Sequence, residues 1–180
     1  STLAGAYLAA ARLDEAIPLF EQNLEDRTRT LGPAHPVTLT SRGNLVAEPV
    51  EREMSPGMTA YLWGYNGQSP GPTIEAVEGD KVRIYVTNKL PENTAVHWHG
   101  QRLPNGMDGV VGLTQPAIEP GKTFVYEFTA RRPGTFMYHP HADEMVQMAM
   151  GMMGFWVTHP KDRADPRIAR VQRDFCLLLG

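Results

Sequence analysis

The stretch KVRIYVTN, residues 81–88, decides the class of fold. Apolar side chains occupy every second position, at Val82, Ile84 and Val86, and mostly polar ones stand between them. Because successive side chains of a strand point to opposite faces, this alternation predicts a strand with one buried face. The stretch TFVYEFTA, residues 123–130, repeats the pattern with aromatic residues. Two such segments indicate a sheet that covers a core.

Glycine and proline interrupt the chain on both sides of these strands, in NGQSPGP (66–72), LPNGMDG (103–109) and IEPGK (118–122). Short strands between such turns predict a mainly β domain, an antiparallel sandwich or barrel. Strands are expected near residues 59–65, 73–77, 81–88, 94–99, 123–129, 134–139, 153–158 and 173–179. A short helix is expected at 142–150.

The first 45 residues follow a helical pattern instead. Apolar positions recur there at spacings of three and four, at Leu13, Ile17, Phe20 and Leu24. Gly32 and Pro33 end this helix, and a second one is expected to begin within residues 35–46. The chain is therefore divided into an N-terminal α-helical hairpin, residues 1–47, and a mainly β domain, residues 48–180.

Composition excludes several classes of protein. The 180 residues carry a net charge of −3 with no basic block, so no nucleic-acid partner is expected. The longest apolar run, residues 145–157, is too short to span a bilayer, so no membrane span is expected. No signal peptide is recognisable. A single cysteine, Cys176, allows no internal disulfide, so sulfur gives no indication of the compartment.

Four of the six histidines stand in two His-x-His pairs, His97 with His99 and His139 with His141. On a strand, residues two apart point to one face, about 7 Å from each other. Neighbouring strands that carry these pairs would bring four imidazoles to one patch, a pre-formed site for a divalent metal. The spacing favours two ions over one chelated ion. Imidazole suits both copper and zinc, so ligand chemistry alone leaves the metal open.

Three segments resemble the multicopper oxidases, the laccase-like family. HWHGQRLPNGMDG (97–109) and YHPHADEMVQMAMGMMG (138–154) resemble the first two copper-binding motifs of the family. YNGQSPGPTIEAVEGDKVRIYVTNKL (65–90) is similar to its opening strands. The resemblance runs from about residue 50 to the end of the chain. It implies a cupredoxin-like Greek-key β-barrel that contributes part of a trinuclear copper cluster.

The resemblance also implies a role for each motif residue. His97 corresponds to a ligand of the type 2 copper, and His99, His139 and His141 to ligands of the type 3 copper pair. Asp108 corresponds to the acidic residue that orients water near the type 2 copper and assists proton delivery. The complete enzyme would take electrons from a small donor, a phenol or a metal ion such as Cu(I), and reduce dioxygen to water.

Part of the family pattern is missing from this chain. The C-terminal His-Cys-His motif, which holds the type 1 copper, and the C-terminal His-x-His segment are absent. Cys176 has no histidine nearby and is expected to be a buried strand residue. Trp98, between the first two histidines, and Tyr138, just before the second pair, are expected to point into the core. The chain alone is not expected to be a competent oxidase.

Residues 3–46 resemble a tetratricopeptide repeat of the long, roughly 42-residue kind, which suggests a protein partner. Only one repeat is present, whereas about three are usually needed for stability. The alternative function is therefore an interaction protein with a structural or copper-storing cupredoxin module. Such repeats are usually cytoplasmic and the oxidases are usually periplasmic or secreted, so the compartment stays open. A natural fusion, a truncated gene and an artificial junction are equally compatible with the sequence.

Methionines are dense after the second histidine pair, at Met145, Met148, Met150, Met152 and Met153. Methionines at helical spacing usually fill a core, and that is the expectation here. A Cu(I) site, and with it a stand-alone copper carrier, is the alternative because thioethers favour Cu(I). His35 is expected in a turn and His159 at the end of a strand, and neither is expected to bind metal.

Overall fold

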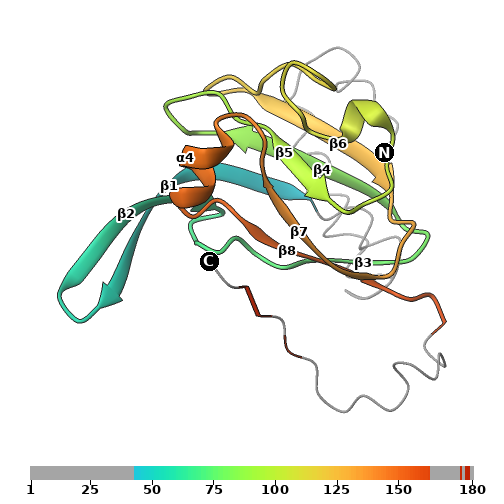
Figure 1. Ribbon diagram of the computed structural model, residues 1–180, viewed down its shortest axis with the longest axis horizontal. Helices are drawn as coiled ribbons and strands as arrows, with labels where there is room; N and C mark the ends of the chain where they lie inside the picture. The colour runs from blue at the N-terminus through green and yellow to red at the C-terminus, as the bar shows by residue number, and fades with distance from the viewer. Residues whose placement is uncertain (1–42, 163–174, 176, 179–180) are drawn as a thin grey trace, which may run out of the picture.

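The computed structural model describes residues 43–162 together with residues 175, 177 and 178 (Figure 1). The strands are β1 (Asn44–Ser55), β2 (Met58–Tyr65), β3 (Ile74–Val77), β4 (Lys81–Asn88), β5 (Val96–His99), β6 (Thr123–Thr129), β7 (Gly134–Pro140) and β8 (Gly154–His159). The helices are the 3₁₀ turn η1 (Asn105–Met107) and α4 (Glu144–Ala149). The expected mainly β architecture is confirmed.

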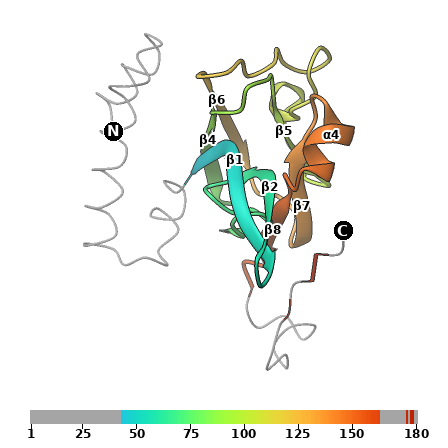
Figure 2. The same cartoon turned by 90° about the vertical axis from the view of Figure 1, so that its left-hand side faces the viewer.

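Two four-stranded sheets form the body of the molecule and enclose the core between them (Figures 1 and 2). The strand order is β2-β1-β4-β6 in one sheet and β3-β8-β7-β5 in the other. The pairing of β4 with β6 follows the alternation in the sequence, since Ile84 lies opposite Tyr126 and Val86 opposite Phe124. The apolar sides of both strands therefore face the same core.

The sheets are mixed, which corrects the expectation of purely antiparallel strands. β1 pairs with β4 in parallel, and β3 pairs with β8 in parallel, whereas the other pairs are antiparallel. Parallel neighbours need a long connection between them. Here that connection exists because the chain leaves β2 for the second sheet, forms β3 there, and returns as β4.

The sequence pattern missed β1, and it assigned residues 44–47 to the helical segment. Pro49 lies within this strand, and proline normally argues against a strand interior. It is tolerated because β4 pairs only with residues 44–47, and because Trp63, opposite Pro49 on β2, donates its N–H to the Met150 carbonyl instead of pairing with Pro49. The far half of β1, residues 51–55, is exposed, and the β1–β2 hairpin projects from the body of the molecule (Figure 1).

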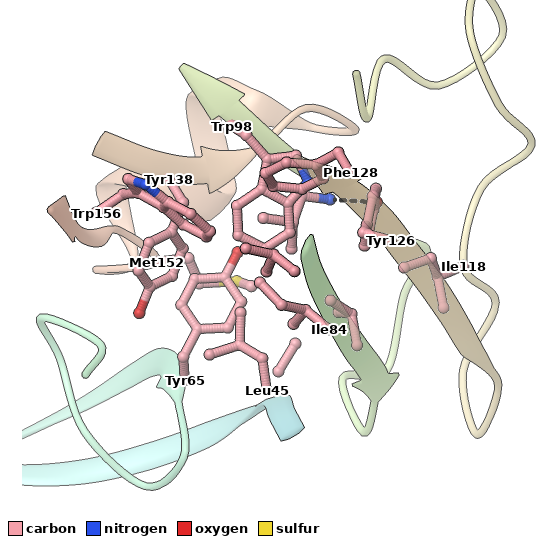
Figure 3. Close-up of a cluster of buried hydrophobic side chains, with 14 of the residues drawn as sticks. Leu45, Tyr65, Ile84, Trp98, Ile118, Tyr126, Phe128, Tyr138, Met152 and Trp156 are labelled. Atoms are coloured by element: carbon pink, nitrogen blue, oxygen red, sulfur yellow. Dashed lines mark hydrogen bonds between the residues drawn. The ribbon is translucent and has the colours of Figure 1, made fainter. Parts of the chain in front are cut away.

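Aromatic side chains dominate the core (Figure 3). Trp98 is its centre, with ring centroids 5.2 Å from Tyr126 and 5.6 Å from Trp156. The expectation that Trp98 and Tyr138 point inward is confirmed, since at most 1% of either residue is exposed. Each such ring removes a large apolar area from water, which is the main stabilising contribution to a small sandwich.

Several expectations lie outside the described residues. They are the N-terminal helical hairpin, its resemblance to a tetratricopeptide repeat, the turn at His35 and the environment of Cys176. The strand expected at 173–179 is described at only three positions, and these form no strand. In the described part of the chain, no helix has the length and apolar character that crossing a bilayer requires.

Candidate metal centre

The four imidazoles come together on the second sheet, where β5 forms the edge and β7 lies next to it. His97 and His139 are direct partners across this strand pair. The ring centroid of His97 lies 5.5 Å from that of His99, 5.3 Å from that of His139 and 5.5 Å from that of His141. The expected convergence of the two pairs is therefore present in the structure.

Strand geometry explains why the rings share one surface. Val96 and Trp98 point into the core from β5, so His97 and His99 must point the other way. On β7 the buried Tyr138 orients His139 in the same manner. His141 lies just past the end of β7, where its backbone N–H donates to the Ala95 carbonyl over 3.3 Å. That bond prolongs the strand pairing by one step.

Backbone carbonyls determine which nitrogens remain free. Nδ1 of His97 lies 2.7 Å from the Asp108 carbonyl oxygen, and Nδ1 of His139 lies 2.9 Å from that of Pro140. A carbonyl can only accept, so both Nδ1 atoms carry the proton and donate. The neutral rings of His97 and His139 therefore present an unprotonated Nε2 to the cluster, as metal ligands require.

The nitrogens that face one another also have the spacing of ligands to a common ion. Nδ1 of His99 lies 3.2 Å from Nε2 of His139, within hydrogen-bond distance. Imidazole nitrogens bind an ion such as zinc at roughly 2.0–2.1 Å, which at a tetrahedral angle separates two of them by about 3.3 Å. One ligand atom each from His97, His99 and His139 lies within 4.8 Å of the others. The donor set fits copper or zinc.

Burial keeps one of these rings in its metal-binding form. Burial lowers the pKa of His139, of which only 3% is exposed, and the charge of a protonated His97 would lower it further. The hydrogen bond to the Pro140 carbonyl opposes this shift in pKa without reversing it. The neutral base is therefore favoured, because a charged ring would lose its hydration there.

Asp108 lies behind His97, where η1 ends. Besides its carbonyl contact, it places Oδ1 at 3.5 Å from Nδ1 of His97. Asp108 also lines an open groove of about 950 Å³. Gly109 brings this loop against β5: its φ is +83°, and a Cβ there would lie 1.9 Å from the Val96 carbonyl oxygen. Only glycine permits that approach.

Sequence reasoning missed Glu144, the first residue of α4. Its Oε1 lies 3.6 Å from Nδ1 of His139, and its Oε2 lies 3.7 Å from Nε2 of His141. The available signal was its position three residues after His141, at the start of an expected helix. Gln147 was also missed. It belongs to the same helix and is completely buried.

The other singled-out residues lie apart from the cluster. His159 ends β8, as expected, and pairs with Glu75 over 2.6 Å. Met152 is buried in the core, as expected, but Met145 is 87% exposed, which corrects the expectation for that residue. The reason is that α4 has six residues and buries only Gln147, so its outer side has no neighbour among the described residues.

Comparison with known proteins identifies relatives of this fold and site. A family model described as multicopper oxidase matches residues 47–163. The chain is 47% identical over 102 residues to L-ascorbate oxidase of Cucurbita pepo, covering 55% of this chain and 18% of that protein. It is 48% identical over 115 residues to copper resistance protein A of Escherichia coli, covering 64% of this chain and 18% of the relative.

Solved structures are similar in the same region. A multicopper oxidase from Pseudomonas thermotolerans aligns with a TM-score of 0.65 and 41% identity, over 66% of this chain and 29% of that one. The multicopper oxidase mgLAC aligns with a TM-score of 0.67 and 37% identity, over 72% and 41% of the two chains. The fold is cupredoxin-like. The chain spans about a fifth of the length of the curated relatives it matches.

Proposed function

The chain belongs to the multicopper oxidase family, and from this premise we propose that residues 48–180 are its N-terminal copper-binding domain. In this proposal His97 is a ligand of the type 2 copper, and His99, His139 and His141 are ligands of the type 3 pair. When bound, copper supplies one-electron redox chemistry and a place where dioxygen is reduced to water. The donor is a small molecule or metal ion, and the remaining ligands lie outside this chain.

The observation that carries the proposal is the pair of facing nitrogens on His99 and His139, 3.2 Å apart. The protein holds His97 and His139 with Nδ1 protonated on carbonyls, so each ring is fixed in orientation and tautomer before metal arrives. The strand pair does this without reorganisation, because both rings project from directly opposite positions of β5 and β7.

Asp108 has a second role in the proposal. Its carbonyl holds His97, and the residue also lines the groove that opens to solvent. We assign its carboxylate to orienting water beside the metal and to passing protons from the groove toward the site. It is a positioning and proton-transfer group, and no contact makes it a ligand.

Copper uptake by the purified 180-residue chain tests the proposal. We expect copper to remain bound at about pH 7.5 and to be released by about pH 4, because protonated imidazole cannot bind metal. The lowered pKa of His139 means that this ring is among the last to be protonated as the pH falls. Metal content after dialysis, measured by mass spectrometry, gives the result.

A matched pair of variants makes the test specific. His99 is exposed, so His99→Gln should leave the fold intact and lower copper affinity at least about tenfold. His159→Gln removes a histidine that pairs with Glu75 instead, and should change nothing. Equal losses in both variants, or no uptake by the unmodified chain, would contradict the proposal.

A further inference from the structure

The sequence contains two Asn-Gly dipeptides, Asn66-Gly67 and Asn105-Gly106. In such a dipeptide the glycine nitrogen can attack the asparagine side chain and expel its amide as ammonia, because glycine has no Cβ to hinder the approach. All four residues are exposed, and a Cβ at either glycine would meet nothing within 4 Å. The two sites differ in how firmly the asparagine amide is held.

Two hydrogen bonds hold the amide of Asn66. Its Oδ1 accepts from the Val46 N–H over 2.7 Å, and its Nδ2 donates to the Asn44 carbonyl over 3.0 Å. These bonds fix the side chain against the start of β1. Both must break before the Gly67 nitrogen can reach the side-chain carbon, so the structure protects this site.

The amide of Asn105 is not held in this way. Within residues 43–162 its side chain has no hydrogen-bond partner, and the N–H of Gly106 has no acceptor. Asn105 is the first residue of η1, where the N–H groups of a helix lack partners within the turn. η1 has only three residues and none of them is buried, so little energy is needed to open it.

We propose that Asn105 is a modification site, at which the chain deamidates without an enzyme. The backbone nitrogen of Gly106 bonds to Cγ of Asn105 and closes a cyclic succinimide. The C–N bond of the amide breaks, and its nitrogen leaves as ammonia together with the proton of the Gly106 N–H. Water then opens the ring at either carbonyl, which leaves aspartate or isoaspartate at position 105. The reaction consumes one water molecule and needs no oxidant or reductant.

Isoaspartate would alter the support of His97. The main chain then runs through the former side chain and gains a CH₂ group, and the old backbone carbonyl of residue 105 becomes a free carboxylate. That carbonyl now closes η1 by accepting from the Asp108 N–H over 3.1 Å. The Asp108 carbonyl in turn accepts from Nδ1 of His97 over 2.7 Å. We expect η1 to open and Asp108 to move away from His97.

The effect on copper rests on the function proposed above, whereas the deamidation itself does not. Isoaspartate should weaken copper binding about tenfold or more, because His97 loses the acceptor that fixes its tautomer. Aspartate at position 105 leaves the backbone unchanged and should not have this effect. The two products therefore separate the consequence of a new charge from that of a rerouted main chain.

The rates of deamidation test the modification site. The purified 180-residue chain is incubated at mildly alkaline pH below its unfolding temperature, and peptide mapping by mass spectrometry follows both Asn-Gly sites. We expect Asn105 to react about tenfold faster than Asn66 or more, because the two hydrogen bonds of Asn66 must break first. Equal rates, or a faster reaction at Asn66, would overturn the inference.

Two variants serve as controls. Gly106 does not have a positive φ and has open space beside it, so Gly106→Ala should fold normally and deamidate more slowly than the unmodified chain. Asn105→Asp carries the new charge on an unaltered backbone and should bind copper like the fresh chain. Circular dichroism and thermal unfolding verify that both variants fold.

Amide hydrogen exchange at Asp108 reports the displacement without copper. It should accelerate in chains that contain isoaspartate at position 105 and stay slow in Asn105→Asp. Unchanged exchange and unchanged copper affinity in the isoaspartate form would disprove the link to His97. If the fresh chain binds no copper, the proposed function fails, while the deamidation rates and the exchange at Asp108 still decide the inference.

Discussion

Single atoms decide what the two histidine pairs can do. Nδ1 of His97 and Nδ1 of His139 each carry the ring proton and donate it to a backbone carbonyl, so Nε2 is the basic nitrogen of both rings. Nothing in the spacing His-x-His specifies this tautomer. It depends on the carbonyl of Asp108, eleven residues from His97 in the chain and brought back by the turn at Gly109.

At this scale we predict that Gly109→Ala destabilises the protein by about 2–4 kcal/mol. The new Cβ would lie 1.9 Å from the Val96 carbonyl oxygen, so the loop must move away from β5 and release His97. Denaturant unfolding measures the loss, and copper affinity should fall with it.

Gly112→Ala is the control for backbone strain alone. Its φ is +77°, similar to that of Gly109, but a Cβ there meets nothing within 4 Å. We expect Gly112→Ala to lower the free energy of unfolding by about 1 kcal/mol and to leave copper affinity unchanged. If the two variants lose stability equally, close approach at Gly109 is not what holds the loop.

Among the elements, β1 and α4 differ most from the sequence pattern. β1 was not expected, because Pro49 and the polar residues after it hide the alternation. α4 was expected at 142–150 and is confirmed as a shorter helix, Glu144–Ala149. A six-residue helix has little stability of its own, so tertiary contacts must hold it. Gln147 provides those contacts from a completely buried position.

We therefore predict that Gln147→Ala lowers the free energy of unfolding by about 2–4 kcal/mol. The substitution removes three hydrogen bonds and leaves the buried Thr94 hydroxyl without its partner. Because α4 would detach from the segment before β5, copper affinity should fall as well. Thermal unfolding and chelator competition measure the two effects.

Gln68→Ala is the matched substitution at an exposed glutamine, whose amide, among the residues that the structure describes, donates only to the Pro70 carbonyl. It should change stability by no more than about 0.5 kcal/mol. An equal loss of stability in Gln147→Ala and Gln68→Ala would show that the buried hydrogen bonds of Gln147 do not stabilise the protein.

For the whole molecule, the decisive contact joins the two sheets beneath the histidine cluster. The hydroxyl of Tyr126, on β6, accepts from the Val96 N–H of β5 over 2.9 Å. Val96 is at the edge of its sheet and immediately precedes His97. The first sheet thus provides the acceptor for a buried backbone N–H of the second sheet. This hydrogen bond fixes β5, and with it His97, on the core.

We predict that Tyr126→Phe destabilises the protein by about 1–3 kcal/mol, because a buried N–H loses its acceptor while the ring stays in place. Amide hydrogen exchange at Val96 should accelerate, which reports the loss at the site itself. Tyr61→Phe alters a hydroxyl on a residue that is 76% exposed and should have no measurable effect. Slow exchange at Val96 in Tyr126→Phe would disprove the link between the sheets.

The sequence by itself determined the periodic elements and the identity of the donors. Alternation in β4 and β6 gave strands whose apolar residues do pair, as Ile84 and Tyr126 show. The two His-x-His pairs, with the glycines and prolines around them, indicated the family and the candidate metal site. These features are local, because a strand's period and a ligand's chemistry are properties of a few adjacent residues.

Only the three-dimensional structure decided which groups complete the site. The Asp108 carbonyl sets the tautomer of His97, and the buried amide of Gln147 joins α4 to the segment before β5. Both contacts depend on how separate loops meet after the two sheets have packed. The Pro140 carbonyl at His139 and Glu144 beside His141 are neighbours in sequence, but their orientation has no periodic signature either. The role of a lone polar residue therefore depends on the partners that folding brings to it.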